Sequence, residues 1–226
     1  MTKRIATQLN TFKYENQSLK LNIGTLVVMG LCSFLIVIAT FTQFDFNHFI
    51  LPFDWFTYMG KNFKDPAVYT HFLKHYRYIP QIPTIMFVTA LLGRRFGITS
   101  VLIYILVGLF LAPVFALGGG FDYVFEYGFG YILAYIPAVF FAGSIVKSGL
   151  TYRNMAQATL VGVLTIHIFG ILYMLFMATL QGENSALILG WMSAQSGAKI
   201  IYDLLFGFLA MIIAKYTKKV LWYAIG

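Results

Sequence analysis

The sequence predicts an all-α integral membrane protein, built as a bundle of six transmembrane helices. Of its 226 residues, 59% are hydrophobic and only 11% are charged, whereas ordinary soluble domains carry about 25% charged residues. A single soluble core stops growing before it could hide so much apolar surface. The hydrophobic residues also gather in separate runs, and roughly 20 such residues cross the about 30 Å of hydrocarbon in a bilayer.

The apolar runs divide the chain into a short leader and one membrane domain. Residues 1–22 are polar and basic, so we expect a cytoplasmic N-terminal segment, followed by a single transmembrane domain over residues 23–222. A long loop at about 43–78 is rich in aromatic residues, which favour the membrane–water interface, and we expect it to form an outer interfacial cap. The expected spans cover roughly residues 23–42, 78–93, 98–116, 130–146, 156–180 and 197–215.

Three of the segments that connect the predicted spans indicate a particular local structure. The prolines of the YIPQIP run at 78–83 disfavour helix before them, so the second span should start unwound and stay short. The GRRFG run at 93–97 should form a tight basic loop between the second and third spans. The loop at 116–130 is rich in glycine, which permits positive φ angles and close backbone approach.

The basic residues predict the orientation of the chain. In a six-span arrangement, one side receives eleven of the 16 Lys and Arg residues, namely Lys3, Arg4, Lys13, Lys20, Arg94, Arg95, Lys147, Arg153, Lys215, Lys218 and Lys219. Cytoplasmic loops carry this kind of excess, so both termini should be cytoplasmic and the protein should be a multi-pass protein of the plasma membrane. Because the charges lie between apolar runs, the formal net charge of +8 does not indicate nucleic-acid binding.

Several kinds of catalytic or metal site have no signature in the sequence. It contains no GxxxxGK[ST] motif for a P-loop, no HExxH motif and no GxSxG motif. Cys32 is the only cysteine, so no intrachain disulfide is expected. No Ser/His/Asp grouping is evident, and His167, alone within the fifth span, is expected to be a packed and hydrogen-bonded residue. We therefore predict no enzyme activity, no cofactor and no metal.

One acidic residue lies within a predicted span. A charged side chain at mid-membrane costs on the order of 3 kcal/mol on insertion scales, so it usually has a partner or a function. Asp203 is this residue, and Lys199 precedes it by four positions, on the same face of a helix. Two interpretations stay open: the two residues form a self-contained ion pair, or they line a polar ligand pocket that opens to the outside.

Further candidate ligand-binding residues are predicted on the outer side of the bundle. The glycine-rich loop, two tyrosines below it and the segment before the second span all face this side. An outward mouth of loops and aromatic side chains suits the capture of a small amphipathic molecule. These candidates are Gln81, Gly119, Gly120, Asp122, Tyr131 and Tyr135.

Four stretches of the chain carry a resemblance to a known family. In order they are LLGRRFGITSVLIYILVGLFLAPVFALGGG at 91–120, YGFGYILAY at 127–135, HIFGILYM at 167–174 and YDLLFGFLA at 202–210. Their order and spacing resemble the BioY family, the biotin-binding S components of energy-coupling factor (ECF) transporters. The similarity covers roughly residues 80–215, and it aligns Asp203 with the acidic ligand residue of the family.

The chain also departs from the pattern of the family. The lysine that follows the aspartate of the family by three positions is Phe206 here, and the PTGG turn has become YGFG. The first span shows no clear AxxxA stripe of the kind that S components present to their membrane partner, and the 43–78 loop is longer than usual. Gln81 corresponds to a glutamine of the family in an ungapped register back from Gly93.

The resemblance implies a substrate-capturing membrane subunit of a vitamin uptake transporter. Such a subunit binds biotin from the outside and delivers it together with an ECF transmembrane coupling protein and ATP-binding-cassette (ABC) ATPases. Asp203 would accept hydrogen bonds from the ureido N–H groups of biotin, and Lys199 with loop backbone N–H groups would bind its carboxylate. Two alternatives stay open: an S component for another small molecule, favoured by Phe206, and a membrane protein of enzymatic or structural role.

The predicted topology can be tested by labelling in intact cells. Cysteines introduced at positions 62 and 184 should react with an impermeant thiol reagent from outside, because both positions fall in outer loops. Cysteines at positions 3 and 218 should not react, because both lie among the basic residues assigned to the cytoplasm. Labelling at position 218 would contradict the six-span orientation.

Overall fold

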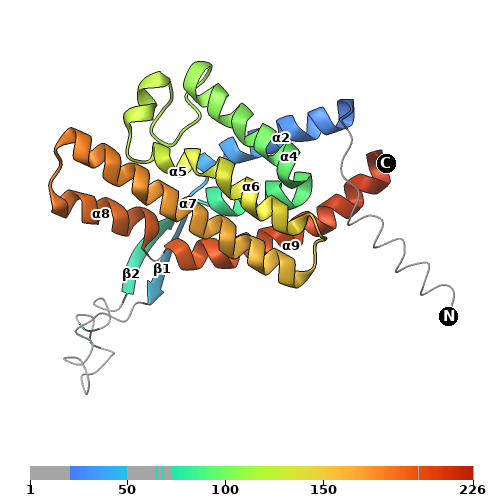
Figure 1. The fold of residues 1–226 in the computed structure, drawn as a ribbon. Helices are drawn as coiled ribbons and strands as arrows, with labels where there is room; N and C mark the ends of the chain where they lie inside the picture. Colours follow the sequence, from blue (N-terminus) through green and yellow to red (C-terminus); the bar gives the residue numbers. More distant parts are fainter. Residues whose placement is uncertain (1–20, 50–64, 66–67, 69–72, 198, 226) are drawn as a thin grey trace.

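The computed structural model describes residues 21–49, 65, 68, 73–197 and 199–225, and it shows a helical bundle with a small β-ribbon at one end (Figure 1). Residues 1–20 of the predicted segment 1–22 and most of the 43–78 loop lie outside the described residues. The elements are α2 (Ile23–Phe41), β1 (Phe44–Phe49), β2 (Leu73–Tyr78), α4 (Gln81–Phe110), η2 (Phe121–Phe125), α5 (Phe129–Leu133), α6 (Tyr135–Val146), α7 (Tyr152–Gln181), α8 (Ser185–Ser196) and α9 (Lys199–Ile225).

Five helical stretches of the described chain are long and apolar enough to cross a membrane, judged by length and composition. They are Ile23–Phe41, Gln81–Phe110, Phe129–Val146, Tyr152–Gln181 and Lys199–Leu221. Large apolar side chains on their outer faces are exposed, including Phe34, Leu172 and Ile213. Lipid is the solvent that such surfaces require, because water would leave this apolar area unfavourably hydrated.

Helix α4 consists of two antiparallel helices, which makes six helical passes in the described chain. Gly93 interrupts the helix with φ 72° and ψ −175°. The amide Nε2 of Gln81 lies 2.9 Å from the hydroxyl of Tyr104, 23 residues later, whereas a straight helix would separate them by about 35 Å. The chain therefore folds back at Gly93, and the predicted six-helix bundle is confirmed.

The fold-back at Gly93 is tighter than the sequence predicts. The expected loop covers 93–97, but helical geometry resumes at Arg94, so Gly93 alone makes the break. A neighbouring helix packs directly against this turn: a Cβ added to Gly143 of α6 would lie 2.7 Å from the Cα of Arg94. The first half of the hairpin, 81–92, spans only about 18 Å, in agreement with the short second span predicted from its prolines.

The segment between the first two spans contains a β-ribbon that the all-α prediction did not include. Strands β1 and β2 pair antiparallel, with Phe44 opposite Tyr78. On its exposed surface, the carboxylate of Asp45 lies 3.4 Å from Nε of Arg77 and 3.5 Å from Nε2 of His75. The ribbon matters for the rest of the molecule because its last residue, Tyr78, reaches the interior of the bundle.

The connection between the last two spans is helical, whereas the sequence analysis assigned no element there. Helix α7 ends at Gly182, which adopts the left-handed conformation that glycine favours at helix C-termini. Helix α8 then runs back beside α7, and α9 begins within a few residues of its end (Figure 1). The end of α8, the start of α9 and the ribbon consequently meet beside the middle of α7.

Replacement of Gly93 by alanine should destabilise the bundle by about 1–3 kcal/mol, because φ 72° with ψ −175° is accessible essentially only to glycine. Gly30→Ala in α2 is the matched control, because a Cβ at either glycine would meet no atom within 4 Å and only Gly93 has positive φ. Thermal unfolding in detergent measures both variants. Equal melting temperatures for the two would contradict the strained hairpin.

Candidate functional site

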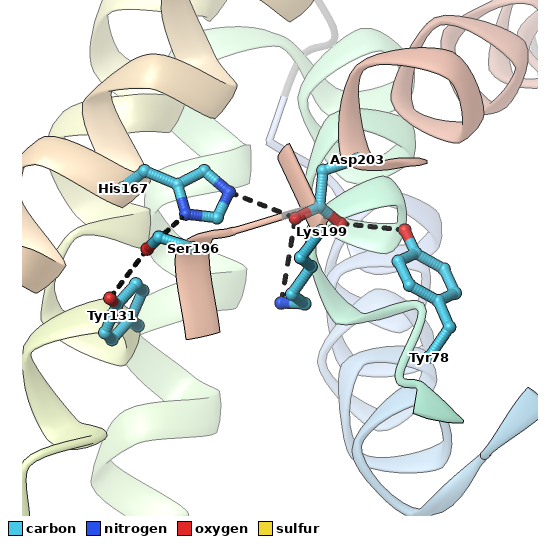
Figure 2. A network of polar contacts seen from close by, with 6 residues as sticks. All are labelled: Tyr78, Tyr131, His167, Ser196, Lys199 and Asp203. Carbon is cyan, nitrogen blue, oxygen red and sulfur yellow. Dashed lines mark hydrogen bonds and ion pairs between the residues drawn. The ribbon is translucent and has the colours of Figure 1, made fainter. Parts of the chain in front are cut away.

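Asp203 lies at the centre of a buried polar cluster (Figure 2). Its side chain is 0% exposed. The hydroxyl of Tyr78 donates to Oδ1 at 2.8 Å, and Nε2 of His167 lies 3.1 Å from Oδ2. The ammonium of Lys199 lies 3.7 Å from the same Oδ2, as expected for residues four apart on one helix. The predicted pairing of Lys199 with Asp203 is thus present, but Asp203 has two further partners.

The cluster continues from His167 to two other helices. Nδ1 of His167 lies 2.9 Å from Oγ of Ser196, the last residue of α8. The same Oγ lies 2.8 Å from the hydroxyl of Tyr131 in α5. Figure 2 shows these side chains as one continuous chain of polar contacts from Tyr131 to Tyr78. Helices α5, α7, α8 and α9 and the ribbon therefore converge on the Asp203 carboxylate.

Two glycines make room for the aromatic end of this chain. A Cβ at Gly170 of α7 would lie 2.5 Å from the ring of Tyr131, and a Cβ at Gly130 of α5 would lie 2.3 Å from Cβ of Tyr173. Each helix thus carries a glycine where a tyrosine of the other helix packs: Gly170 of α7 against Tyr131 of α5, and Gly130 of α5 against Tyr173 of α7. A larger residue at either position would push α5 away and remove Tyr131 from Ser196.

An aromatic cluster covers the ribbon side of Asp203. The rings of Tyr76 and Tyr202 stack with centroids 5.5 Å apart, and the ring of Phe206 lies 5.3 Å from that of Tyr78. Burial and the nearby Asp203 carboxylate raise the pKa of Tyr78, so its phenol stays protonated and donates to Asp203. Phe206 packs against the ring of Tyr78 and so helps to hold this donor in place.

Gln81 belongs to a second polar cluster. Its Nε2 donates to Oγ1 of Thr40 at 2.7 Å and to the hydroxyl of Tyr104 at 2.9 Å. Tyr135 is buried, its electrostatic neighbours include Tyr104 and Asp203, and among the described residues its hydroxyl has no hydrogen-bond partner. A buried hydroxyl without a partner is costly, so Tyr135 stays a candidate ligand contact.

The other candidates lie in the glycine-rich loop. A Cβ at Gly119 would lie 2.7 Å from the carbonyl oxygen of Gly108, so Gly119 packs against the end of α4. Gly120 has φ 95°, and its N–H donates to the Gly108 carbonyl at 2.8 Å. Asp122 is exposed on η2, and within the described chain no hydrogen bond or ion pair joins it to Asp203. The structure thus groups Asp203, Lys199 and Tyr131, and places these three loop residues apart from them.

Side chains attach the same loop to α7 at two points and to the residue just after the C-cap of α7 at a third. Tyr173 donates its hydroxyl to the carbonyl of Val124, and Gln181 donates Nε2 to the carbonyl of Phe125 at 3.2 Å. Tyr127 donates its hydroxyl to Glu183 at 2.8 Å. These contacts keep the loop close to the bundle near α5. Because they are side-chain hydrogen bonds, the loop would be free to move if they broke.

Part of the Asp203 cluster was not predicted from the sequence. His167 is packed and hydrogen-bonded as predicted, but it belongs to a Ser/His/Asp grouping that was not evident in the sequence. Ser196 and Tyr78 were not identified, because a single serine or tyrosine carries no signal without its partners. The one usable signal was His167 itself, since a polar side chain in the middle of an apolar span needs partners.

Comparison with known families identifies the chain. The BioY family model matches residues 78–222. The chain belongs to the BioY family. The match begins at Tyr78 and includes every residue of the Asp203 cluster, whereas strand β1 and most of β2 precede it. BioY membership agrees with the resemblance seen in the four sequence motifs.

Individual relatives support this placement in the BioY family. A probable biotin transporter BioY from Lysinibacillus sphaericus is 32% identical over 96 residues, which are 42% of this chain and 49% of that protein. One from Pyrococcus horikoshii is 35% identical over 100 residues, 44% of this chain and 57% of that protein. The alignments thus span about half the length of these curated relatives.

A solved structure shares the fold of the chain. The crystal structure of the S-component for biotin from an ECF-type ABC transporter superposes with a TM-score of 0.53 over 89% of this chain and 95% of that one, at 20% identity. This similarity confirms the predicted S-component fold. At that identity it carries no information about which ligand this chain binds.

Proposed function

We propose that this BioY-family chain captures biotin from the outside as the membrane subunit of a vitamin uptake transporter. The observation that carries the proposal is the wholly buried Asp203 carboxylate, held by two hydrogen bonds and one ion pair within the family-matched region. A charge in a transmembrane segment is costly, so its retention indicates a function. We assign it the role of hydrogen-bond acceptor for the ureido ring of biotin.

The geometry of Asp203 leaves capacity for such a hydrogen bond. A carboxylate offers about four acceptor positions; Tyr78 and His167 occupy two, and the Lys199 ammonium lies beside Oδ2 as a neighbouring charge. A ureido N–H can donate to a remaining position, and a hydrogen bond to a charged acceptor is roughly twice as strong as a neutral one. The unpartnered hydroxyl of Tyr135 can complete the contact with the neutral ring.

Other predicted residues would bind the rest of the ligand. The aromatic side chains beside Asp203 can enclose the apolar thioether ring and tail of biotin. Lys199 is 14% exposed and stays a proposed ligand contact beside Asp203. Gln81 and the loop residues Gly119, Gly120 and Asp122 stay proposed contacts for the outer part of the ligand.

Family membership and the charge pattern support a proposal for the partners and the orientation. We propose delivery of biotin through an ECF transmembrane coupling protein with ABC ATPases, in the plasma membrane, with both termini cytoplasmic. Residues 23–222 would form the single membrane domain. We assign no catalytic role to the Ser196–His167–Asp203 contacts, because Ser196 is held between His167 and Tyr131, an arrangement that fixes side-chain orientation.

An S component for a different small molecule is the second candidate. It is favoured by Phe206, which packs against Tyr78 where the family resemblance places a lysine. Native mass spectrometry of the purified protein separates the candidates, because a co-purified ligand reports its own mass. A bound mass other than that of biotin would assign the site to the second candidate.

Asp203→Asn should weaken binding of radiolabelled biotin by about 1.5–3 kcal/mol, the worth of a hydrogen bond to a charged group. Asn keeps the side-chain volume, so loss of affinity reflects the loss of charge. Asp45→Asn removes an exposed carboxylate from the ribbon and serves as the control. The combined variant Lys199→Met, Asp203→Leu removes the ion pair, and full biotin affinity in it would refute the ligand role of Asp203.

Biotin should slow hydrogen exchange in the loop at 116–130, which we propose closes over the ligand. Gly118 and Gly120 have positive φ and give the backbone freedom to move. Tyr173→Phe removes the hydrogen bond to Val124 and should speed exchange in the ligand-free protein. Exchange that is unchanged at saturating biotin would count against a gating loop.

A further inference from the structure

We infer that His167 is the positioning residue of the site: as the neutral Nε2–H tautomer, it fixes one oxygen of Asp203 and is itself fixed by Ser196 of α8. For the ligand, this inference rests on the proposed function. The proton on Nε2 rests on the geometry alone, and the direction of the Ser196 hydrogen bond is the one that a neutral ring requires. Figure 2 shows the imidazole between Ser196 and Asp203, with one ring nitrogen facing each.

The direction of each hydrogen bond follows from what the groups can donate. A carboxylate only accepts, so Nε2 of His167 must carry the proton that points at Oδ2 of Asp203. In a neutral imidazole Nδ1 then has no proton and must accept, so the Ser196 hydroxyl donates to it. Because the one hydroxyl proton of Ser196 is donated to Nδ1, Oγ of Ser196 can only accept from the hydroxyl of Tyr131.

The two oxygens of Asp203 have different surroundings. At Oδ2, His167 makes the hydrogen bond at 3.1 Å, while Lys199 at 3.7 Å lies beyond hydrogen-bond distance and contributes charge only. At Oδ1, Tyr78 is the donor. His167 and Tyr78 therefore fix the rotation of the carboxylate, and Oδ1 keeps an acceptor position for a ligand N–H. His167 need not touch the ligand to control this geometry.

Ser196 connects the positioning residue to a separate helix. It is the final residue of α8 and is 6% exposed, so its contacts with His167 and Tyr131 hold the end of α8 against α5 and α7. A movement of α8 would withdraw the proton donor from Nδ1 and permit the ring to turn. The orientation of Asp203 is thereby linked to the position of α8.

The tautomer is measured by nitrogen NMR of ¹⁵N-histidine-labelled full-length protein in detergent. Replacing His48, His71 and His75 with glutamine leaves His167 as the one labelled ring. We expect a protonated Nε2 and an unprotonated Nδ1, and a shift of the Nδ1 resonance in Ser196→Ala. A protonated Nδ1, in either the other neutral tautomer or the cation, would overturn the assignment.

Two variants of His167 separate positioning from packing. The amide nitrogen of glutamine can take the place of Nε2 and donate to Asp203, whereas that of asparagine can take the place of Nδ1 and cannot reach Asp203. We expect His167→Gln to bind biotin within about three-fold of wild type and His167→Asn to bind about ten-fold or more weakly. The melting temperatures of both variants show whether either is misfolded.

The outcomes distinguish the inference from the proposed function. Equal affinity of the two variants, at similar melting temperature, would overturn the positioning role while wild-type binding still supported biotin capture. If wild type binds no biotin, the proposed function fails. The tautomer and a double-mutant cycle between His167 and Asp203 in melting temperature then test the positioning contact without a ligand. No coupling in that cycle would overturn it.

Discussion

The rest of the structure depends on the need to stabilise one carboxylate inside a membrane protein. Asp203 is wholly buried, and an uncompensated charge there would cost several kcal/mol. Its three partners come from three parts of the chain: the ribbon supplies Tyr78, α7 supplies His167, and the first turn of α9 supplies Lys199. Each of these elements is held in place partly because the carboxylate requires its donor.

The helical hairpin of α4 makes this convergence possible. Because the chain reverses at Gly93, the start of α4 lies beside its own second half, as the contact of Gln81 with Tyr104 shows. Tyr78 precedes that start by three residues, so the reversal also determines where the ribbon meets the bundle. A single glycine near the opposite end of the hairpin thus affects the position of a donor to Asp203.

Much of the fold was predictable from sequence, because hydrophobic run length and the distribution of charge act over short distances. The helix content and the Lys199–Asp203 pair follow from such local patterns. The contacts of Asp203 with Tyr78 and His167 join residues 125 and 36 positions apart, and no local pattern specifies them. The ribbon was missed because the aromatic composition of the 43–78 loop indicates the interface without indicating a regular structure, and no element was predicted for the segment that forms α8.

Charge accounts for what this site can select. Lys199 already neutralises Asp203, so a cationic ligand would gain little there and would displace a fixed partner. A neutral ligand with N–H groups can use the remaining acceptor position of Oδ1 without disturbing the pair. With Phe206 in place of a second cation, the packed ring supports Tyr78 and keeps that donor on Oδ1. The proposed role of Asp203 therefore fits a neutral donor group, and the ureido ring of biotin has this property.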